Sequence, residues 1–335
     1  MRIKNLFIVP TLLLALTGAV ACGNSKKADK TDANEKKVII KAPDFNADSA
    51  YTYVKAQTDF GPRVPNTQAH RDCGEYLAKQ LEKFGAKVYS QYADLEAWDG
   101  TMLKARNIIG AYNPDSKKRV MLCAHWDSRP YADYDADEKN HKKPIDGAND
   151  GASGVGVLLE IARQIQLKAP AIGIDIIFFD AEDYGTPDWH RGSYKPHDWC
   201  LGSQYWSRTP HVEGYFARFG ILLDMVGGKG GTFYYEPYSY RTARKEVKKI
   251  WEKAHELGFS SFFIKQEGSE VTDDHVYVHE LARIPCVDII NYDPTCENSS
   301  FGPTWHTVND NISNIDRNTM KAVGQTVMDV IYNEK

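Results

Sequence analysis

The sequence has little charge imbalance, few cysteines and no internal repeat. It holds 41 basic and 45 acidic residues among 335, for a formal net charge of −4, and basic residues do not cluster outside the N-terminal segment. Nucleic acid is therefore not an expected partner. The length and a hydrophobic content of 42% fit one large α/β domain or two small ones with a sizeable core.

Cysteines number only six, and five of them follow Cys22. An odd number argues against a complete disulfide framework, and the sequence does not name a pair for a single bridge. Cys123 and Cys286 lie in apolar, strand-like runs. We expect them to be small buried side chains.

Residues 1–22 have the pattern of an export signal. Arg2 and Lys4 precede an apolar run, Leu6–Leu16, that is too short for a comfortable membrane span, and small residues then lead to Cys22. A cysteine at this point resembles a bacterial lipobox and predicts lipidation of Cys22, with simple secretory cleavage as the alternative. Residues 23–42 form a polar tether. We therefore expect an exported, periplasmic protein, anchored by lipid to a bacterial membrane, with a catalytic domain over 43–335.

Strand-like and helix-like segments alternate along that domain. The apolar, strand-like runs are Ala105–Tyr112, Val120–Ala124, Ile172–Asp180, Phe219–Leu223 and Ile284–Ile290. The segments with helical periodicity are Asn66–Phe84, Ser153–Leu167, Arg241–Leu257 and Arg317–Tyr332. This order predicts an α/β layered domain with a mixed or largely parallel sheet. The long polar loops 128–146 and 184–199 are expected to border a site.

Potential metal ligands follow the predicted strands. The fragments are Ala-His125-Trp-Asp127, Gly-Ala-Asn-Asp150-Gly, Phe-Asp-Ala-Glu182-Asp183, Leu-Leu-Asp224-Met, Asp273-Asp274-His275 and Trp305-His306-Thr. Each has an ordinary explanation alone, such as a strand end, a turn or a helix cap. Together they predict a zinc site, because functional groups gather at the carboxyl ends of strands in open α/β sheets. Adjacent acids such as Glu182 and Asp183 suit a division between proton transfer and metal binding.

The order of these motifs resembles the zinc-dependent exopeptidase superfamily of aminopeptidases. Within it, three features resemble the glutaminyl cyclase branch: Asp273-Asp274-His275, the Trp305 that precedes His306, and His-Trp-Asp-Ser-Arg-Pro from His125. The resemblance runs from about Phe45 to the C-terminus. It implies a single-domain α/β/α fold with a central mixed, largely parallel, twisted sheet.

The resemblance also implies a role for each matching position. One Zn²⁺ would be held by three residues, namely Asp150, Asp183 and His306. Glu182 would be the general acid/base. Asp224 and Asp273 would form hydrogen bonds around this proton shuttle.

The remaining positions concern the pocket and a second metal. Trp305 and Trp189 would line the pocket for the substrate side chain. His125 and Asp224 would hold a second metal in the peptidases, whereas the cyclases leave that site empty. Asp127 would orient His125.

The activity that the resemblance implies is that of an acyltransferase, a glutaminyl-peptide cyclotransferase. It would convert the N-terminal glutamine of peptides or proteins to pyroglutamate and release ammonia. A two-metal zinc aminopeptidase is the alternative enzyme, and a non-catalytic peptide-binding module on the same fold is the third hypothesis. A monomer is the default expectation for the assembly.

Overall fold

A mixed sheet of six strands forms the centre of the described chain, which comprises residues 40–297 and 299–335 of a computed structural model. The strand order is β1-β2-β4-β3-β5-β8. The strands are β1 (Lys87–Glu96), β2 (Met102–Tyr112), β3 (Arg119–His125), β4 (Gly173–Phe179), β5 (Gly220–Asp224) and β8 (Cys286–Ile290). A separate pair is made by β6 (Phe233–Tyr235) and β7 (Phe263–Glu267).

The four strands β4, β3, β5 and β8 run parallel, whereas β1 and β2 are antiparallel additions at one edge. His125 at the end of β3 pairs in register with Phe179 at the end of β4. Asp224 at the end of β5 pairs with Ile290 at the end of β8. The carboxyl ends of all four parallel strands therefore meet at one edge of the sheet, where α/β proteins commonly place their sites.

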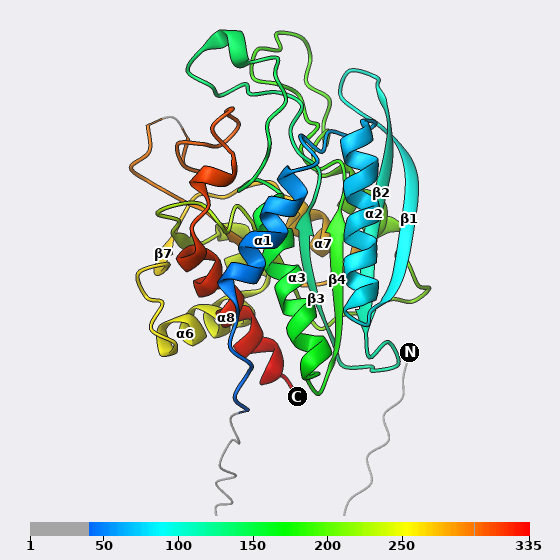
Figure 1. The fold of residues 1–335 in the computed structure, drawn as a ribbon, viewed down its shortest axis with the longest axis vertical. Helices are drawn as coiled ribbons and strands as arrows, with labels where there is room; N and C mark the ends of the chain where they lie inside the picture. The colour runs from blue at the N-terminus through cyan, green and yellow to red at the C-terminus, as the bar shows by residue number, and fades with distance from the viewer. Residues whose placement is uncertain (1–39, 298) are drawn as a thin grey trace, which may run out of the picture. The chain divides into compact units, whose positions relative to one another are not determined.

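Helices cover both faces of the sheet. On the face seen in Figure 1, α3 (Ala152–Leu167) packs with α1 (Ala47–Thr58), α2 (Gln68–Lys83) and α8 (Arg317–Tyr332). Those on the other face are α4 (Leu201–Arg208), α5 (Pro237–Thr242) and α7 (Asp274–Ala282), while α6 (Arg244–Glu256) packs on α8 and β7. Two short 3₁₀ turns are η1 (Glu138–Asn140) and η2 (Ile312–Asn314).

Alternation along the strands creates a core on each face. In β3, Leu122 belongs to the core beneath α1, α2, α3 and α8, whereas Met121 and Cys123 belong to the core beneath α4 and α7. All three side chains are fully buried. Successive residues of a strand point to opposite faces, so a strand covered on both sides must be apolar throughout.

The predicted fold class is confirmed, with an α/β/α arrangement around a mixed, mostly parallel sheet. The five predicted strands and the helix Arg317–Tyr332 correspond to observed elements. The segment Arg241–Leu257, expected to be one helix, forms parts of two, because the backbone of Ala243 leaves the helical region with φ −132°. The sequence patterns missed β1, an edge strand without buried side chains in its span.

The predicted export signal, Cys22 and most of the tether lie outside the described residues. Among the residues that are described, no helix has the length and apolar character to cross a membrane. The five described cysteines are all free, and Cys123 and Cys286 are buried as expected.

Candidate metal centre and active site

A pocket of about 420 Å³ opens at the carboxyl ends of the parallel strands. It is lined by a group of acids, Asp150, Glu182, Asp183, Asp224 and Asp273, and by an aromatic group, Tyr134, Tyr194, Trp199, Phe301 and Trp305. The long loops after β3 and β4, at the top of Figure 1, contribute Asp133 and Thr186. The pocket therefore combines closely spaced carboxylates with an apolar, aromatic wall.

Asp150, Asp183 and His306 form the first group of potential metal ligands, with one ligand atom from each within 4.8 Å of the others. Asp150 precedes α3, Asp183 follows β4, and His306 lies in the loop before η2. The Nε2 atom of His306 is 3.3 Å from Asp183 Oδ1 and 3.6 Å from Asp150 Oδ2. All three residues are buried.

The donor set of this first group fits zinc. A tetrahedral zinc ion with bonds of about 2.0 Å to nitrogen and oxygen holds its ligand atoms roughly 3.3 Å apart, which is close to both distances from His306. Asp150 Oδ2 and Asp183 Oδ2 are buried and have no hydrogen-bond partner among the described residues. Burial, reinforced by the charge of Asp150, raises the pKa of Asp183 to about 6. A divalent cation would satisfy both oxygens and stabilise the ionised carboxylates.

Backbone hydrogen bonds hold two of these ligands in place. The Asp310 carboxylate accepts the N–H groups of Asn149 and Asp150 at 2.8 and 3.0 Å. The Asp127 carboxylate accepts the N–H groups of Glu182 and Asp183 at 3.1 and 3.2 Å. Both acceptors are almost wholly buried. Such outer carboxylates fix the direction in which ligands point.

Gly151 allows the turn from Asp150 into α3. Its φ is +89°, and a Cβ at this position would lie 2.7 Å from the Asp127 carbonyl oxygen. Gly61 has the same φ, and no atom lies within 4 Å of the point that its Cβ would occupy. A Gly61→Ala variant therefore measures the loss of stability that the positive φ alone causes, without a clash.

We expect Gly151→Ala to lower the free energy of unfolding by about 3 kcal/mol or more, since the clash adds to the strain of a positive φ. Gly61→Ala should cost only about 1–2 kcal/mol. Denaturant unfolding of both variants measures the difference. Equal losses would contradict the close approach of the Asp150 turn to Asp127.

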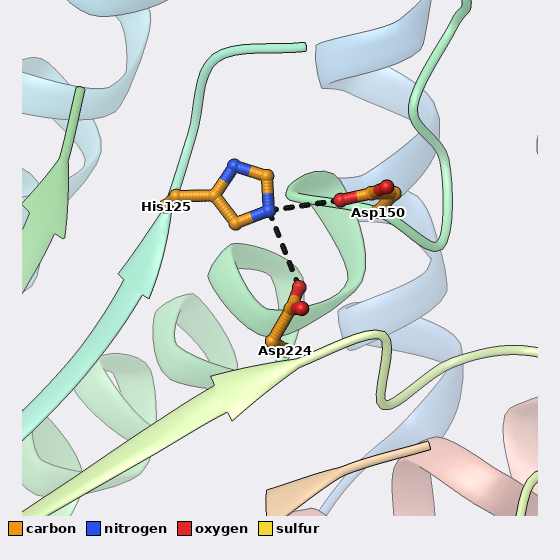
Figure 2. A group of neighbouring side chains, drawn as sticks. All are labelled: His125, Asp150 and Asp224. Carbon is orange, nitrogen blue, oxygen red and sulfur yellow. Dashed lines mark hydrogen bonds and ion pairs between the residues drawn. The ribbon is translucent and has the colours of Figure 1, made fainter. Parts of the chain in front are cut away.

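His125, Asp150 and Asp224 form a second group, shown in Figure 2. His125 Nε2 is 3.0 Å from Asp150 Oδ1 and 3.2 Å from Asp224 Oδ1, as the dashed lines mark. These distances allow hydrogen bonds and are also close to the separation of roughly 3.3 Å between ligands of one zinc. Burial raises the pKa of Asp224 to about 7, although His125 opposes that rise. On the other side of the ring, His125 Nδ1 is 3.5 Å from Asp127 Oδ1.

Glu182 lines the same pocket as the three residues of the first group. It belongs with Cys200 and Asp273 to a further close group of side chains. Burial raises the pKa of Glu182 well above its ordinary value; the neighbouring Asp183 and Asp273 add to the rise, and His125 opposes it. A carboxyl with a raised pKa is suited to both taking up and releasing a proton.

Arg129 and Asp133 support the first group from the loop after β3. Arg129 forms a two-pronged ion pair with Asp133 at 2.5–2.7 Å and donates to the Asp183 carbonyl oxygen at 3.0 Å. Asp133 Oδ1 is in turn 3.4 Å from His306 Nδ1. Although burial opposes it, Arg129 and His306 hold the pKa of Asp133 below its ordinary value. This chain of contacts orients the His306 ring so that Nε2 faces Asp150 and Asp183.

A comparison with known families decides the relationship of this chain. The sequence model of peptidase family M28 matches residues 107–331, which include both groups of potential ligands. The chain belongs to peptidase family M28. Among solved structures, this M28 protein is similar to the Bacteroides thetaiotaomicron glutaminyl cyclase bound to N-acetylhistamine, with 63% identity and a TM-score of 0.86. That match covers 88% of this chain and 100% of the other.

Curated relatives of this M28 protein carry two kinds of name. The Bacillus subtilis aminopeptidase YwaD is 28% identical over 282 residues, covering 81% of this chain and 54% of that protein. The Bos taurus glutaminyl-peptide cyclotransferase is 27% identical over 246 residues, covering 64% of this chain and 62% of that protein. The chain thus spans little more than half the length of these two relatives. Family membership alone does not choose between a peptidase and a cyclase.

Of the two tryptophans predicted for the aromatic wall, one lines the M28 pocket and the other does not. Trp305 lines the pocket as expected and stacks on His306, with ring centroids 3.7 Å apart. Trp189 does not line it but packs edge-on against Tyr131 at 5.0 Å. Trp199 takes this place instead, parallel to the His306 ring at 6.0 Å. The loop turns because Thr186 N–H donates to Asp198 at 2.9 Å, which brings Trp199 back to the pocket.

The three side chains of the fragment Asp273-Asp274-His275 have different surroundings. Asp273 lines the pocket and caps α7. Asp274 is fully buried beside it, and burial raises its pKa well above the ordinary value. His275 lies outside the pocket lining, with Nε2 3.1 Å from Glu236 and Nδ1 3.5 Å from Asp288, and forms a close group with Asp273 and Asp288. Of the three side chains, Asp273 alone is placed to contact a ligand in the pocket.

Proposed function

We propose that this M28 protein is a glutaminyl cyclase, which converts N-terminal glutamine to pyroglutamate with release of ammonia. The observation that carries the proposal is the position of Glu182, which lines one pocket together with Asp150, Asp183, His306 and the aromatic side chains. The high identity to a bacterial glutaminyl cyclase over that protein's whole chain supports it.

The side chains fit the demands of this reaction. A zinc ion held by Asp150, Asp183 and His306 would supply Lewis-acid polarisation of the glutamine γ-carbonyl group. Glu182 removes a proton from the attacking α-amine and delivers one to the departing amide nitrogen. Attacking and leaving groups belong to one residue, so the remaining task is to hold a folded conformer of the glutamine.

The aromatic side chains of the pocket hold this folded conformer. Trp305, Trp199 and Phe301 face the pocket and present flat apolar surfaces to a compact side chain. Trp305 and Phe301 also contact each other, with ring centroids 4.9 Å apart. Closely packed rings exclude water from the reacting atoms, which strengthens the electrostatic interactions within the site.

A zinc aminopeptidase is the second candidate, favoured by the group His125, Asp150 and Asp224 and by the similarity to the Bacillus aminopeptidase. Its chemistry would use a second metal at that group. The apolar wall that Trp305 gives the pocket supports the cyclase instead, because it suits a compact substrate side chain. A non-catalytic binding module has no need of Glu182 in its observed position.

The proposal extends to the setting of the enzyme. Substrates would be peptides or proteins with N-terminal glutamine, met outside the cytoplasm by a monomer anchored through lipid at Cys22. The support for this part is the sequence pattern of residues 1–22.

The test is incubation of the zinc-loaded protein with Gln-Phe-Ala and Leu-Phe-Ala, followed by mass spectrometry. Loss of the mass of ammonia from the first peptide, with the second intact, is the expected result. Release of free leucine would contradict the cyclase proposal in favour of the aminopeptidase.

A further inference from the structure

The thiol of Cys200 contacts the Glu182 carboxylate. Its Sγ donates a hydrogen bond to Glu182 Oε1 at 3.2 Å, and its side chain is fully buried. Among the described residues, no other hydrogen bond to the Glu182 carboxylate is formed by a side chain. Cys200 does not line the pocket, whereas Glu182 does. The thiol therefore contacts the carboxylate from the protein side and leaves the other side for substrate.

The backbone holds Cys200 in this position independently of its side chain. Cys200 and Ala181 both have positive φ, 58° and 53°. The Cys200 N–H donates to the Glu182 carbonyl oxygen at 2.9 Å, and the Leu201 N–H donates to the Ala181 carbonyl oxygen at 3.0 Å. Two unusual backbone turns are thereby joined, and they place the thiol and the carboxylate face to face. Positive φ in residues other than glycine is often found at functional sites.

From this contact we infer that Cys200 is a positioning residue, whose thiol fixes the Glu182 carboxylate in the orientation that proton transfer to and from the substrate requires. The inference rests on the proposed function. Glutamate has several rotatable bonds, and proton transfer requires it within hydrogen-bond reach of the reacting nitrogen. A thiol is a weak donor, so it can restrain the carboxylate without strongly reducing its affinity for a proton.

The surroundings favour a protonated donor over a nucleophile or a metal ligand at Cys200. Burial, together with the charges of Glu182 and Asp274, raises the pKa of the Cys200 thiol well above its ordinary value. A thiolate is the form that attacks carbon or binds metal. The protonated thiol instead supplies a hydrogen to a carboxylate that other acids surround.

The kinetic test compares Cys200→Ala with Cys200→Ser. Alanine removes the donor, whereas serine restores an O–H at nearly the same place. We expect kcat for Gln-Phe-Ala to fall about tenfold in Cys200→Ala with KM changed by less than about twofold, and to recover to within about threefold of wild type in Cys200→Ser. Zinc content should stay unchanged in both. Cys286→Ala, which removes an equally buried thiol at the other end of the sheet, should keep the wild-type kcat.

Three results of the variant measurements would overturn the inference: wild-type kcat in Cys200→Ala, an equal loss in the serine variant, or a loss of zinc that shows an effect through Asp183. A wild-type protein that fails to cyclise would instead refute the proposed function.

The infrared S–H band of Cys200, isolated as the difference between wild type and Cys200→Ala, tests the contact without activity. It should lie at a hydrogen-bonded frequency and move toward the free-thiol frequency in Glu182→Ala. A free-thiol band in wild type would also overturn the inference.

Discussion

Glu182→Gln is expected to lower the rate of cyclisation by about 10²–10⁴-fold, the usual contribution of a positioned general acid/base. Glutamine has nearly the same shape and can still accept from Cys200, but it cannot take a proton from the attacking amine. Glu182 is not one of the three residues of the first group, Asp150, Asp183 and His306. The variant should therefore bind zinc as wild type does. Metal analysis and kcat measured on the same preparation test both statements.

The matched control is Glu270→Gln, the same chemical change at another acid of the pocket lining. Glu270 is exposed and forms an ion pair with Arg241 at the surface. Exposed ion pairs contribute little to stability, about 0–1 kcal/mol, and Glu270 lies outside the close groups of potential ligands. Its variant should retain kcat within a few-fold of wild type. A fully active Glu182→Gln protein would refute the proton-transfer role.

Asp183→Ala is expected to abolish zinc binding and, with it, cyclisation to the level of the uncatalysed reaction. Asp183 Oδ1 is 3.3 Å from His306 Nε2, and Oδ2 is buried without a partner among the described residues. Removing one of three protein ligands leaves too few donors for a stable zinc site. Metal that binds the folded state stabilises it. A chelator should therefore lower the unfolding temperature of wild type but leave that of Asp183→Ala unchanged.

Asp188→Ala serves as the control, because Asp188 also lines the pocket but is exposed and belongs to neither group of potential ligands. It should bind zinc and respond to the chelator as wild type does. If Asp183→Ala retained a full complement of zinc, the assignment of the metal to the first group would be wrong.

The positions of the acids in the pocket could be predicted largely from the sequence. His125, Glu182, Asp183 and Asp224 lie at or directly after continuous apolar runs, and such runs form parallel strands covered on both faces. Once the strands are parallel, their carboxyl ends meet at one edge. Local sequence therefore predicts both the position of each strand and the edge of the sheet at which its last residue lies.

The contributions of the long loops could not be predicted in the same way. Asp133 and Cys200 contact His306 and Glu182 from loops that lack hydrophobic periodicity, so their paths depend on tertiary contacts such as the Arg129–Asp133 pair. The exchange of Trp189 for Trp199 has the same origin. Sequence spacing from Asp183 gave no reason to prefer the later tryptophan, because the hydrogen bond from Thr186 to Asp198 folds the loop back.

The most direct measurement is a zinc titration of the metal-free protein, with Gln-Phe-Ala and Leu-Phe-Ala present together in each sample. If this protein is a one-metal cyclase, loss of ammonia from the glutamine peptide should rise to its maximum at about one zinc per chain, and leucine should not be released at any point. Leucine release that grows as a second zinc binds would contradict it. That result would indicate that His125, Asp150 and Asp224 hold the second zinc of an aminopeptidase.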